Sequence, residues 1–216
     1  IIDIIDCLDD NFLDTKQEIL VVVLQKKQDK SDNKRFTLSI NNNTIFNTPS
    51  NIHLITDLYK DSVSLYSIGC NVSVGTVVWN QCKDILTDDD TQTRLIYSGD
   101  IKTNELELVN YKDPSKKNYI MKDGYTGPTL LLNRGYGKGN YTFSYCLVDM
   151  DTPYLIENHV IAIRLCGEHS KERLLEKYNK IIQSFCNDKT KMFVDLYFGN
   201  NAINTTELKY VLPIYM

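Results

Sequence analysis

The chain has 216 residues, of which 42% are hydrophobic, so it is long enough to bury one substantial core. Lys and Arg number 24 against 28 Asp and Glu, which gives a net charge of -4, and the chain has no basic run that could follow a phosphate backbone. We therefore predict a single domain over residues 1–216 and exclude nucleic acid as a partner. The longest apolar run, residues 19–24, is far shorter than the roughly 20 residues that cross a bilayer, so we expect no membrane span and the prior removal of any secretory signal.

The first half of the chain carries strand patterns. Residues 19–24 are rich in β-branched side chains and too few for a typical helix, which predicts a strand buried on both faces in the middle of a sheet. Residues 35–40 alternate apolar and polar side chains, as in a strand with one face in the core. Residues 62–79 contain two glycines among Val, Ile and Tyr, which predicts two strands joined by a turn or bulge. The acidic residues 88–90 are expected in an exposed loop.

The second half predicts further strands and one helix. Residues 110–139 are rich in Gly and Pro, which indicates loops and short strands, and residues 141–147 and 159–166 follow as strands. Residues 170–185 place six apolar side chains on one helical face, so we predict an amphipathic helix there. Residues 192–198 and 208–214 are expected to be strands. The predicted fold is mainly β: a two-sheet antiparallel β-sandwich with one amphipathic helix at about 170–185 and long loops.

Cysteines and glycosylation sequons indicate an oxidising compartment. The six cysteines are scattered singly rather than in the CxxC pairs of zinc and redox sites, so we predict disulfides and leave their pairing open. Four Asn-X-Ser/Thr sequons favour a secreted protein, or one in the lumen of the endoplasmic reticulum if a retention tail was trimmed. The predicted disulfide residues are Cys7, Cys70, Cys82, Cys146, Cys166 and Cys186, and the predicted glycosylation sites are Asn42, Asn71, Asn140 and Asn204.

The residues that could carry chemistry form no recognisable motif. His53, His159 and His169 have neither HExxH spacing nor cysteines at metal-ligand offsets, which disfavours zinc. Residues 135–139 are glycine-rich, but a strand follows them where a phosphate loop would lead into a helix. Trp79 and the tyrosines are interpreted as packing residues. We therefore predict no catalytic, cofactor-binding or metal-binding residues, no cofactor and no enzyme activity, and the sequence identifies no ligand-binding residues.

A similarity to the poxvirus immune evasion domain family rests on residues 134–146 (RGYGKGNYTFSYC) and residues 163–167 (IRLCG). Cys7, followed by the predicted strand at residues 19–24, is similar to the opening of those proteins. The family includes secreted chemokine-binding proteins. The resemblance implies a disulfide-held β-sandwich that sequesters a host immune protein without catalysis.

The prediction from these observations is a secreted viral immunomodulatory glycoprotein. Its partner would be a host cytokine, a chemokine, a class I histocompatibility molecule or a costimulatory ligand, and a homodimer is compatible with this role. An adhesive or structural surface glycoprotein of an AT-rich parasite is the alternative, because it would share the cysteines, the sequons and the Asn bias. A secreted hydrolase whose site is assembled from distant carboxylates is the third hypothesis.

Overall fold

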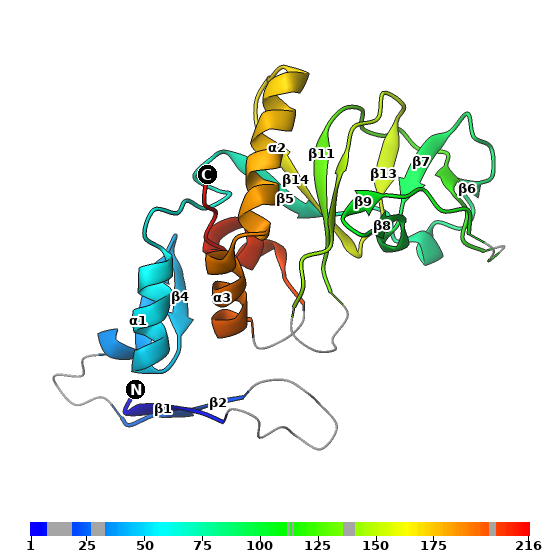
Figure 1. Cartoon of the computed structure of the whole chain (residues 1–216). Coiled ribbons are helices and arrows are strands. Elements are labelled where there is room, and N and C mark those ends of the chain that lie inside the picture. The colour runs from blue at the N-terminus through cyan, green and yellow to red at the C-terminus, as the bar shows by residue number, and fades with distance from the viewer. Residues whose placement is uncertain (8–18, 27–32, 112, 114, 136–140, 199–201) are drawn as a thin grey trace. The chain divides into compact units, whose positions relative to one another are not determined.

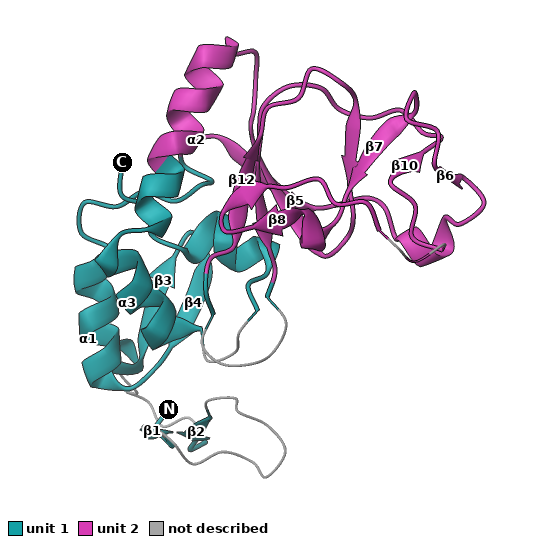
Figure 2. Ribbon diagram, turned by 45° about the vertical axis from the view of Figure 1, so that its right-hand side comes forward, with its two compact units in different colours: residues 1–67, 135–142, 181–216 teal, residues 68–134, 143–180 magenta. Residues whose placement is uncertain are grey.

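The computed structural model describes residues 1–7, 19–26, 33–111, 113, 115–135, 141–198 and 202–216 (Figure 1). Strands make up 30% of the chain and helices 27%, and the strands form several small sheets. It forms two compact units, with residues 1–67, 135–142 and 181–216 in unit 1 and residues 68–134 and 143–180 in unit 2 (Figure 2). The prediction of one domain over residues 1–216 stays a prediction. Within the described residues, no helix combines the length and the apolar character needed to cross a membrane.

Unit 1 combines helices with two separate two-stranded antiparallel sheets, β1–β2 and β3–β4. Short loops connect β3 to β4 and β4 to α1, so these neighbours in sequence pack locally. Helix α2 begins in unit 2 and ends in unit 1. The elements of unit 1 are β1 Asp3–Asp6, β2 Leu20–Val23, a 3-10 turn Lys34–Phe36, β3 Thr37–Ile40, β4 Asn43–Phe46, α1 Pro49–Leu58, the end of α2 Lys171–Phe185, α3 Asp188–Tyr197 and a π-helical turn Glu207–Val211.

Local sequence signals explain where α1 begins and how it packs. Thr48 accepts a hydrogen bond from the Asn51 backbone N–H at 3.3 Å, and Pro49 occupies the first helical position, where its missing N–H costs nothing. The buried residues Ile52, Ile55 and Leu58 recur every three positions and so share one helical face. This face gives unit 1 part of its core.

Unit 2 contains two four-stranded sheets. The first has the order β12-β11-β14-β5 and is antiparallel throughout. The second has the order β13-β7-β10-β6, and β13 runs parallel to β7. The strands of unit 2 are β5 Cys70–Val74, β6 Leu86–Thr87, β7 Thr93–Ile96, β8 Ile101–Lys102, β9 Glu105–Leu106, β10 Tyr119–Ile120, β11 Thr129–Asn133, β12 Tyr145–Val148, β13 Tyr154–Ile156 and β14 Val160–Leu165, with 3-10 turns at Trp79–Gln81 and Ser98–Asp100.

The core of unit 2 is shared between its two four-stranded sheets, and β8 and β9 form a further two-stranded sheet. Ile96 and Ile156 of the second sheet belong to the same buried cluster as Leu131, Cys146 and Val160 of the first. The partly buried Trp79 packs against a neighbouring cluster that contains Leu95 and Tyr97. The apolar strands at residues 129–133 and 160–163 are almost completely buried, as continuous apolar runs require.

The predicted fold is confirmed in part. The helix at about 170–185 is α2, the antiparallel strands of residues 35–40, 141–147 and 159–166 contain β3, β12 and β14, and residues 88–90 are exposed. The prediction of a mainly β chain is too simple, because several small sheets and nearly as much helix take the place of one two-sheet sandwich.

Four element predictions are wrong. Residues 62–79 contain one strand, β5, and not the two predicted. Residues 192–198 lie mostly in α3, because Asn187 caps its start by accepting the Lys189 backbone N–H at 2.8 Å and the helix buries Phe193 and Val194. Residues 208–214 contain a π-helical turn rather than a strand. The strand at residues 19–24 exists as β2, but it lies in a two-stranded sheet with all four residues exposed, not in the middle of a large sheet.

Candidate functional site

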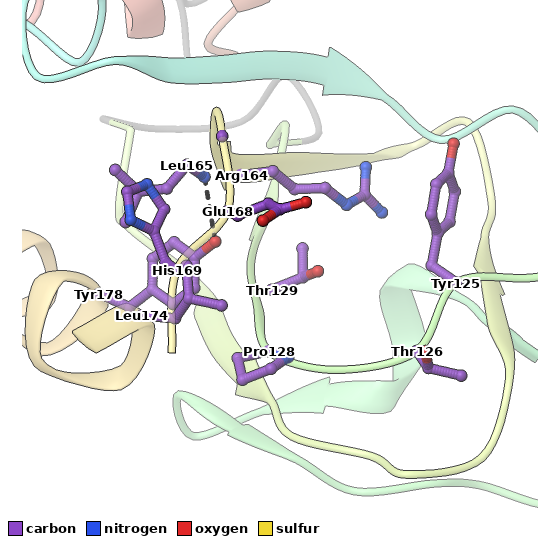
Figure 3. A pocket seen from close by; sticks show the side chains of 11 residues that line it. Tyr125, Thr126, Pro128, Thr129, Arg164, Leu165, Glu168, His169, Leu174 and Tyr178 are labelled. Atoms are coloured by element: carbon purple, nitrogen blue, oxygen red, sulfur yellow. Dashed lines mark hydrogen bonds between the residues drawn. The ribbon is translucent and has the colours of Figure 1, made fainter. Parts of the chain in front are cut away.

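A pocket of about 310 Å³ lies within unit 2 (Figure 3). The end of β14 supplies Arg164, the segment before β11 supplies Tyr125, and α2 supplies Tyr178. A smaller hollow adjoins it, shares Arg164 and Tyr125, and adds Ser73 and Thr76. We call the larger space the Arg164 pocket. The lining of the Arg164 pocket therefore combines a cation, the carboxylate of Glu168, aromatic rings and hydroxyl groups.

Arg164 is stacked on an aromatic ring and keeps an unused donor. Its guanidinium carbon lies 4.2 Å from the centre of the Tyr125 ring, a cation–π geometry that fixes the plane of the fork. Figure 3 shows the side chain extending across the pocket toward Tyr125. The buried Nε has no hydrogen-bond partner among the described residues. A buried donor without a partner is costly, so a ligand acceptor at this position would relieve that cost.

Backbone hydrogen bonds hold Tyr125 in place under the guanidinium. Tyr125 and Tyr154 exchange two backbone hydrogen bonds, each of 2.8 Å. The Tyr154 hydroxyl contacts the Thr129 hydroxyl at 2.6 Å and the Gly127 carbonyl at 2.8 Å. Gly127 has a φ of 88°, a left-handed conformation that glycine adopts without strain. The aromatic platform is therefore built before any ligand arrives.

The positive charge of Arg164 acts on the Tyr154 hydroxyl. Burial raises the pKa of Tyr154, and the hydrogen bond with Thr129, the positive charge of Arg164 and a hydrogen bond with Arg164 partly oppose that rise. Burial also raises the pKa of Tyr178, whose oxygen accepts the Leu165 backbone N–H at 3.2 Å. Both phenols therefore remain neutral at neutral pH.

The loop between β14 and α2 closes one side of the Arg164 pocket. His169 Nε2 lies 2.9 Å from the Cys166 carbonyl oxygen, which can only accept, so Nε2 carries the proton. Glu168, beside it, adds a carboxylate to the pocket lining. Gly167, with a φ of 88°, makes the turn possible. The pocket thus offers both donors and acceptors to a polar ligand.

A second cluster in unit 2 joins a lysine to two tyrosines. The Lys116 ammonium lies 4.3 Å from the Tyr97 ring centre and 3.8 Å from that of Tyr111. Burial lowers the pKa of Lys116, and the charges of Glu157 and Asp100 partly offset this. Burial likewise raises the pKa of Tyr97 and of Tyr111. These contacts hold the Lys116 side chain against the rings of Tyr97 and Tyr111.

The predicted disulfides do not form. All six cysteines lie among the described residues, and no disulfide joins any two of them. Cys146 is fully buried in the apolar cluster of unit 2, and burial raises its pKa to about 12, so it acts as a small hydrophobic residue. Cys166 is exposed at the end of β14. The cysteines Cys7, Cys70, Cys82, Cys146, Cys166 and Cys186 are divided between the two units.

The predicted glycosylation sites stay predictions. Asn42, Asn71 and Asn204 are exposed, and Asn140 lies outside the described residues. Most of the glycine-rich segment 135–139 also lies outside them.

The three histidines lie at separate places. His53 pairs with Asp57 at 3.6 Å on the surface, and His159 Nδ1 contacts the buried Glu157 carboxylate. Among the described residues, no three His, Cys, Asp or Glu side chains come together as metal ligands. Only His169 lines the Arg164 pocket.

Sequence reasoning missed the Arg164 pocket. Arg164 is the next-to-last residue of an otherwise apolar strand, which is a usable signal because a cation there must either pair or face a cavity. Tyr125 gives no comparable signal, because it follows a glycine in a loop-forming segment and its partner lies 39 positions away. The pairing depends on tertiary structure alone.

Comparison with known proteins gives one informative match. No family model matches the chain. The protein described as Type II methyltransferase M.CvrRI, from Paramecium bursaria Chlorella virus XZ-6E, is 24% identical over 209 residues, which cover 95% of this chain and 50% of the relative. The chain therefore spans about half the length of the curated relative that it matches.

This similarity corrects the functional predictions. The match extends over nearly the whole chain, whereas the resemblance to the poxvirus immune evasion family rested on short segments and on cysteines that form no disulfides. That resemblance is wrong, and with it the prediction of a viral immunomodulator that binds a host immune protein. The expectation of a protein without enzyme activity is contradicted as well, because the relative is a methyltransferase.

Proposed function

We propose that this chain is part of a DNA methyltransferase and contacts DNA through the Arg164 pocket. The similarity to a Type II methyltransferase supports a role in DNA methylation and corrects our exclusion of nucleic acid as a partner. Arg164 is the single observation that carries the assignment to this site, because its guanidinium is stacked and its Nε lacks a partner among the described residues. Secretion stays an untested prediction.

The chemistry of the Arg164 pocket fits DNA in two ways. A guanidinium fork donates to phosphate oxygens or to the O6 and N7 acceptors of guanine. The stack on Tyr125 orients the fork before binding, so little side-chain entropy remains to be lost. By contrast, Lys171 at the start of α2 is engaged by Asp149 at 2.8 Å. Of these two cations, Arg164 is therefore the better placed to bind DNA at the Arg164 pocket.

A net charge of -4 does not conflict with this role. Base readout depends on a few well-placed groups, whereas long-range attraction depends on the number of phosphates neutralised. A single oriented arginine supplies about 1–3 kcal/mol of discrimination at one base pair. We accordingly expect modest affinity from this chain and a measurable contribution from Arg164.

Nothing in the Arg164 pocket identifies it as the site of a sulfonium methyl donor such as S-adenosylmethionine. The sulfonium centre is a cation, which the guanidinium of Arg164 would repel and the carboxylate of Glu168 would attract. One face of the Tyr125 ring is covered by the guanidinium. We derive no step of methyl transfer through this pocket.

The test is binding of the whole chain to fluorescein-labelled DNA duplexes of randomised sequence, measured by anisotropy. Arg164→Ala should weaken binding about 5- to 150-fold, which corresponds to about 1–3 kcal/mol. Arg164→Lys should keep most of the affinity if the contact is to phosphate. It should lose affinity as Arg164→Ala does if the guanidinium fork reads a base edge.

The matched control is Arg173→Ala, which removes the same side chain from an exposed position on α2 outside the pocket. It should change the affinity much less than Arg164→Ala does. Equal effects of the two alanine variants, or no binding by the unaltered chain, would refute the proposal.

A further inference from the structure

Two opposite charges line the Arg164 pocket. The carboxylate of Glu168 and the guanidinium of Arg164 both belong to its lining (Figure 3). In the part of the chain that the structure describes, Glu168 forms no hydrogen bond or ion pair. The nearest lysine in the sequence, Lys171, pairs with Asp149 and Asp151 instead. The pocket therefore offers a ligand an unpaired acceptor group as well as the guanidinium donors.

The main chain on both sides of Glu168 is held in place. Gly167 precedes it with a φ of 88°, which sets the direction of the turn. His169 follows it and is anchored by the hydrogen bond of its Nε2 to the Cys166 carbonyl at 2.9 Å. Only the side chain of Glu168 remains to be ordered by a ligand, so binding costs little conformational entropy.

The guanidinium of Arg164 retains donors for a ligand. An arginine has five N–H donors. A hydrogen bond with Tyr154 uses part of this capacity, and Nε has no partner among the described residues. A guanidinium fork pairs best with two adjacent acceptors, and a carboxylate pairs best with two adjacent donors. A ligand that satisfies both groups therefore carries an acceptor pair next to a donor pair.

Guanine is the nucleobase that has this pattern. Its O6 and N7 form the acceptor pair, and its N1–H and N2 amino group form the donor pair beside it. Adenine, cytosine and thymine each lack at least one of the two pairs. The pocket volume of about 310 Å³ lies at the lower end of the range of ligand pockets, about 300–1,000 Å³, which suits one base rather than several.

We propose that the Arg164 pocket binds one unpaired guanine base, with Arg164 donating to O6 and N7 and Glu168 accepting from N1–H and the N2 amino group. In a duplex, cytosine occupies those two donors, so Glu168 reaches them only after the base has left its pair. The inference rests on the proposed function, because a DNA strand supplies the base. A free guanine nucleotide has the same base chemistry, and the experiments below separate the two sources.

The first experiment titrates the isotope-labelled chain with deoxyguanosine monophosphate and follows the amide resonances of residues 164–169 by NMR. Two analogues each lack one group: deoxyinosine monophosphate lacks the N2 amino group, and the second analogue has carbon in place of N7. Each should bind at least about threefold more weakly, because it loses a hydrogen bond to a charged side chain. Deoxyadenosine monophosphate carries the same phosphate. Equal affinity for the adenine and guanine nucleotides would assign the binding to phosphate and overturn the inference.

Variants assign each group of the base to one residue. Glu168→Gln should weaken guanine binding and remove the difference between guanine and the base of deoxyinosine, while the loss caused by replacing N7 remains. Arg164→Ala should do the reverse. Glu172→Gln is the matched control, because it removes the same charge from an exposed residue of α2 outside the pocket lining, and it should leave all affinities unchanged. Discrimination against deoxyinosine that survives Glu168→Gln would overturn the inference.

The second experiment identifies the source of the base. Anisotropy compares a fluorescein-labelled strand of thymine alone with the same strand carrying one central guanine. The guanine should strengthen binding at least about threefold, and pairing it with cytosine in a duplex should remove the gain. An equal gain in the duplex would show that a paired base is read and would overturn the inference.

The two proposals fail separately. If the chain binds DNA in an Arg164-dependent way without any preference for guanine, the guanine site is refuted and the proposed function stands. If deoxyguanosine monophosphate binds with the expected discrimination while no DNA binds, the guanine site stands with a free nucleotide as its ligand and the proposed function is refuted.

Discussion

Asp100 should be the most sensitive carboxylate of unit 2. Its side chain is completely buried and accepts hydrogen bonds from the backbone N–H groups of Tyr97 at 2.8 Å and Val109 at 2.9 Å, and from the Tyr111 hydroxyl at 3.3 Å. Arg94 lies 4.0 Å away. One carboxylate thus ties the end of β7 to the segment at residues 109–111.

The cost of Asp100→Ala follows from those contacts. A hydrogen bond to a charged group contributes about 1.5–3 kcal/mol. The substitution would leave two buried backbone N–H groups without their acceptor and the buried Arg94 charge without its nearby counter-charge. The three contacts share one acceptor, so their contributions do not add in full. We expect unit 2 to lose about 3–5 kcal/mol of unfolding free energy. Asp100→Asn keeps one oxygen and should lose less.

Urea denaturation followed by Trp79 fluorescence measures this loss. Trp79 is the only tryptophan and packs against the cluster that contains Tyr97, so its emission reports on unit 2. Asp113→Ala is the matched control, because Asp113 is exposed and its side chain bonds only to the nearby Ser115 in the described structure. The reasoning would be refuted if Asp100→Ala shifted the midpoint no more than Asp113→Ala.

Three further predictions concern thiols, pH and backbone packing. Thiol titration of the denatured protein should find six thiols, and in the native protein Cys146 should react far more slowly than exposed Cys166; fewer than six would indicate disulfides. Burial raises the pKa of Glu207, so the folded state holds that proton more tightly and stability is lost as pH rises through the unfolded and folded pKa values. Glu207→Gln should therefore reduce the fall in Tm between about pH 4 and about pH 7, and an unchanged fall would contradict this. Gly75→Ala should lower the unfolding free energy by about 1–3 kcal/mol in a denaturant titration, because its Cβ would lie 2.2 Å from the carbonyl oxygens of Ile156 and Glu157; no loss would mean that the backbone moves aside.

Sequence patterns predicted the elements whose periodicity is unambiguous. Helix α2 follows from six apolar residues on one face, and β14 from a dense apolar run. Helix α1 also carries its own signals, since Thr48 and Pro49 mark its start and three apolar residues follow at helical spacing. These signals are sufficient to predict helix α1, which is absent from the predicted elements.

The wrong predictions have tertiary causes. Residues 192–198 combine Phe, Val and Tyr, which favour strands. The Asn187 cap and the burial of Phe193 stabilise a helix instead. The run at residues 19–24 was correctly predicted as a strand, yet the burial it demands is not met within the described chain. The Arg164–Tyr125 pair has no sequence spacing at all and required the structure.

The most direct test of DNA contact at the Arg164 pocket is amide hydrogen exchange of the whole chain with and without duplex DNA. The account predicts slower exchange in residues 125–129 and 164–169 when DNA is present, and loss of that effect in Arg164→Ala. Protection confined to other segments, or no change in either range, would contradict it.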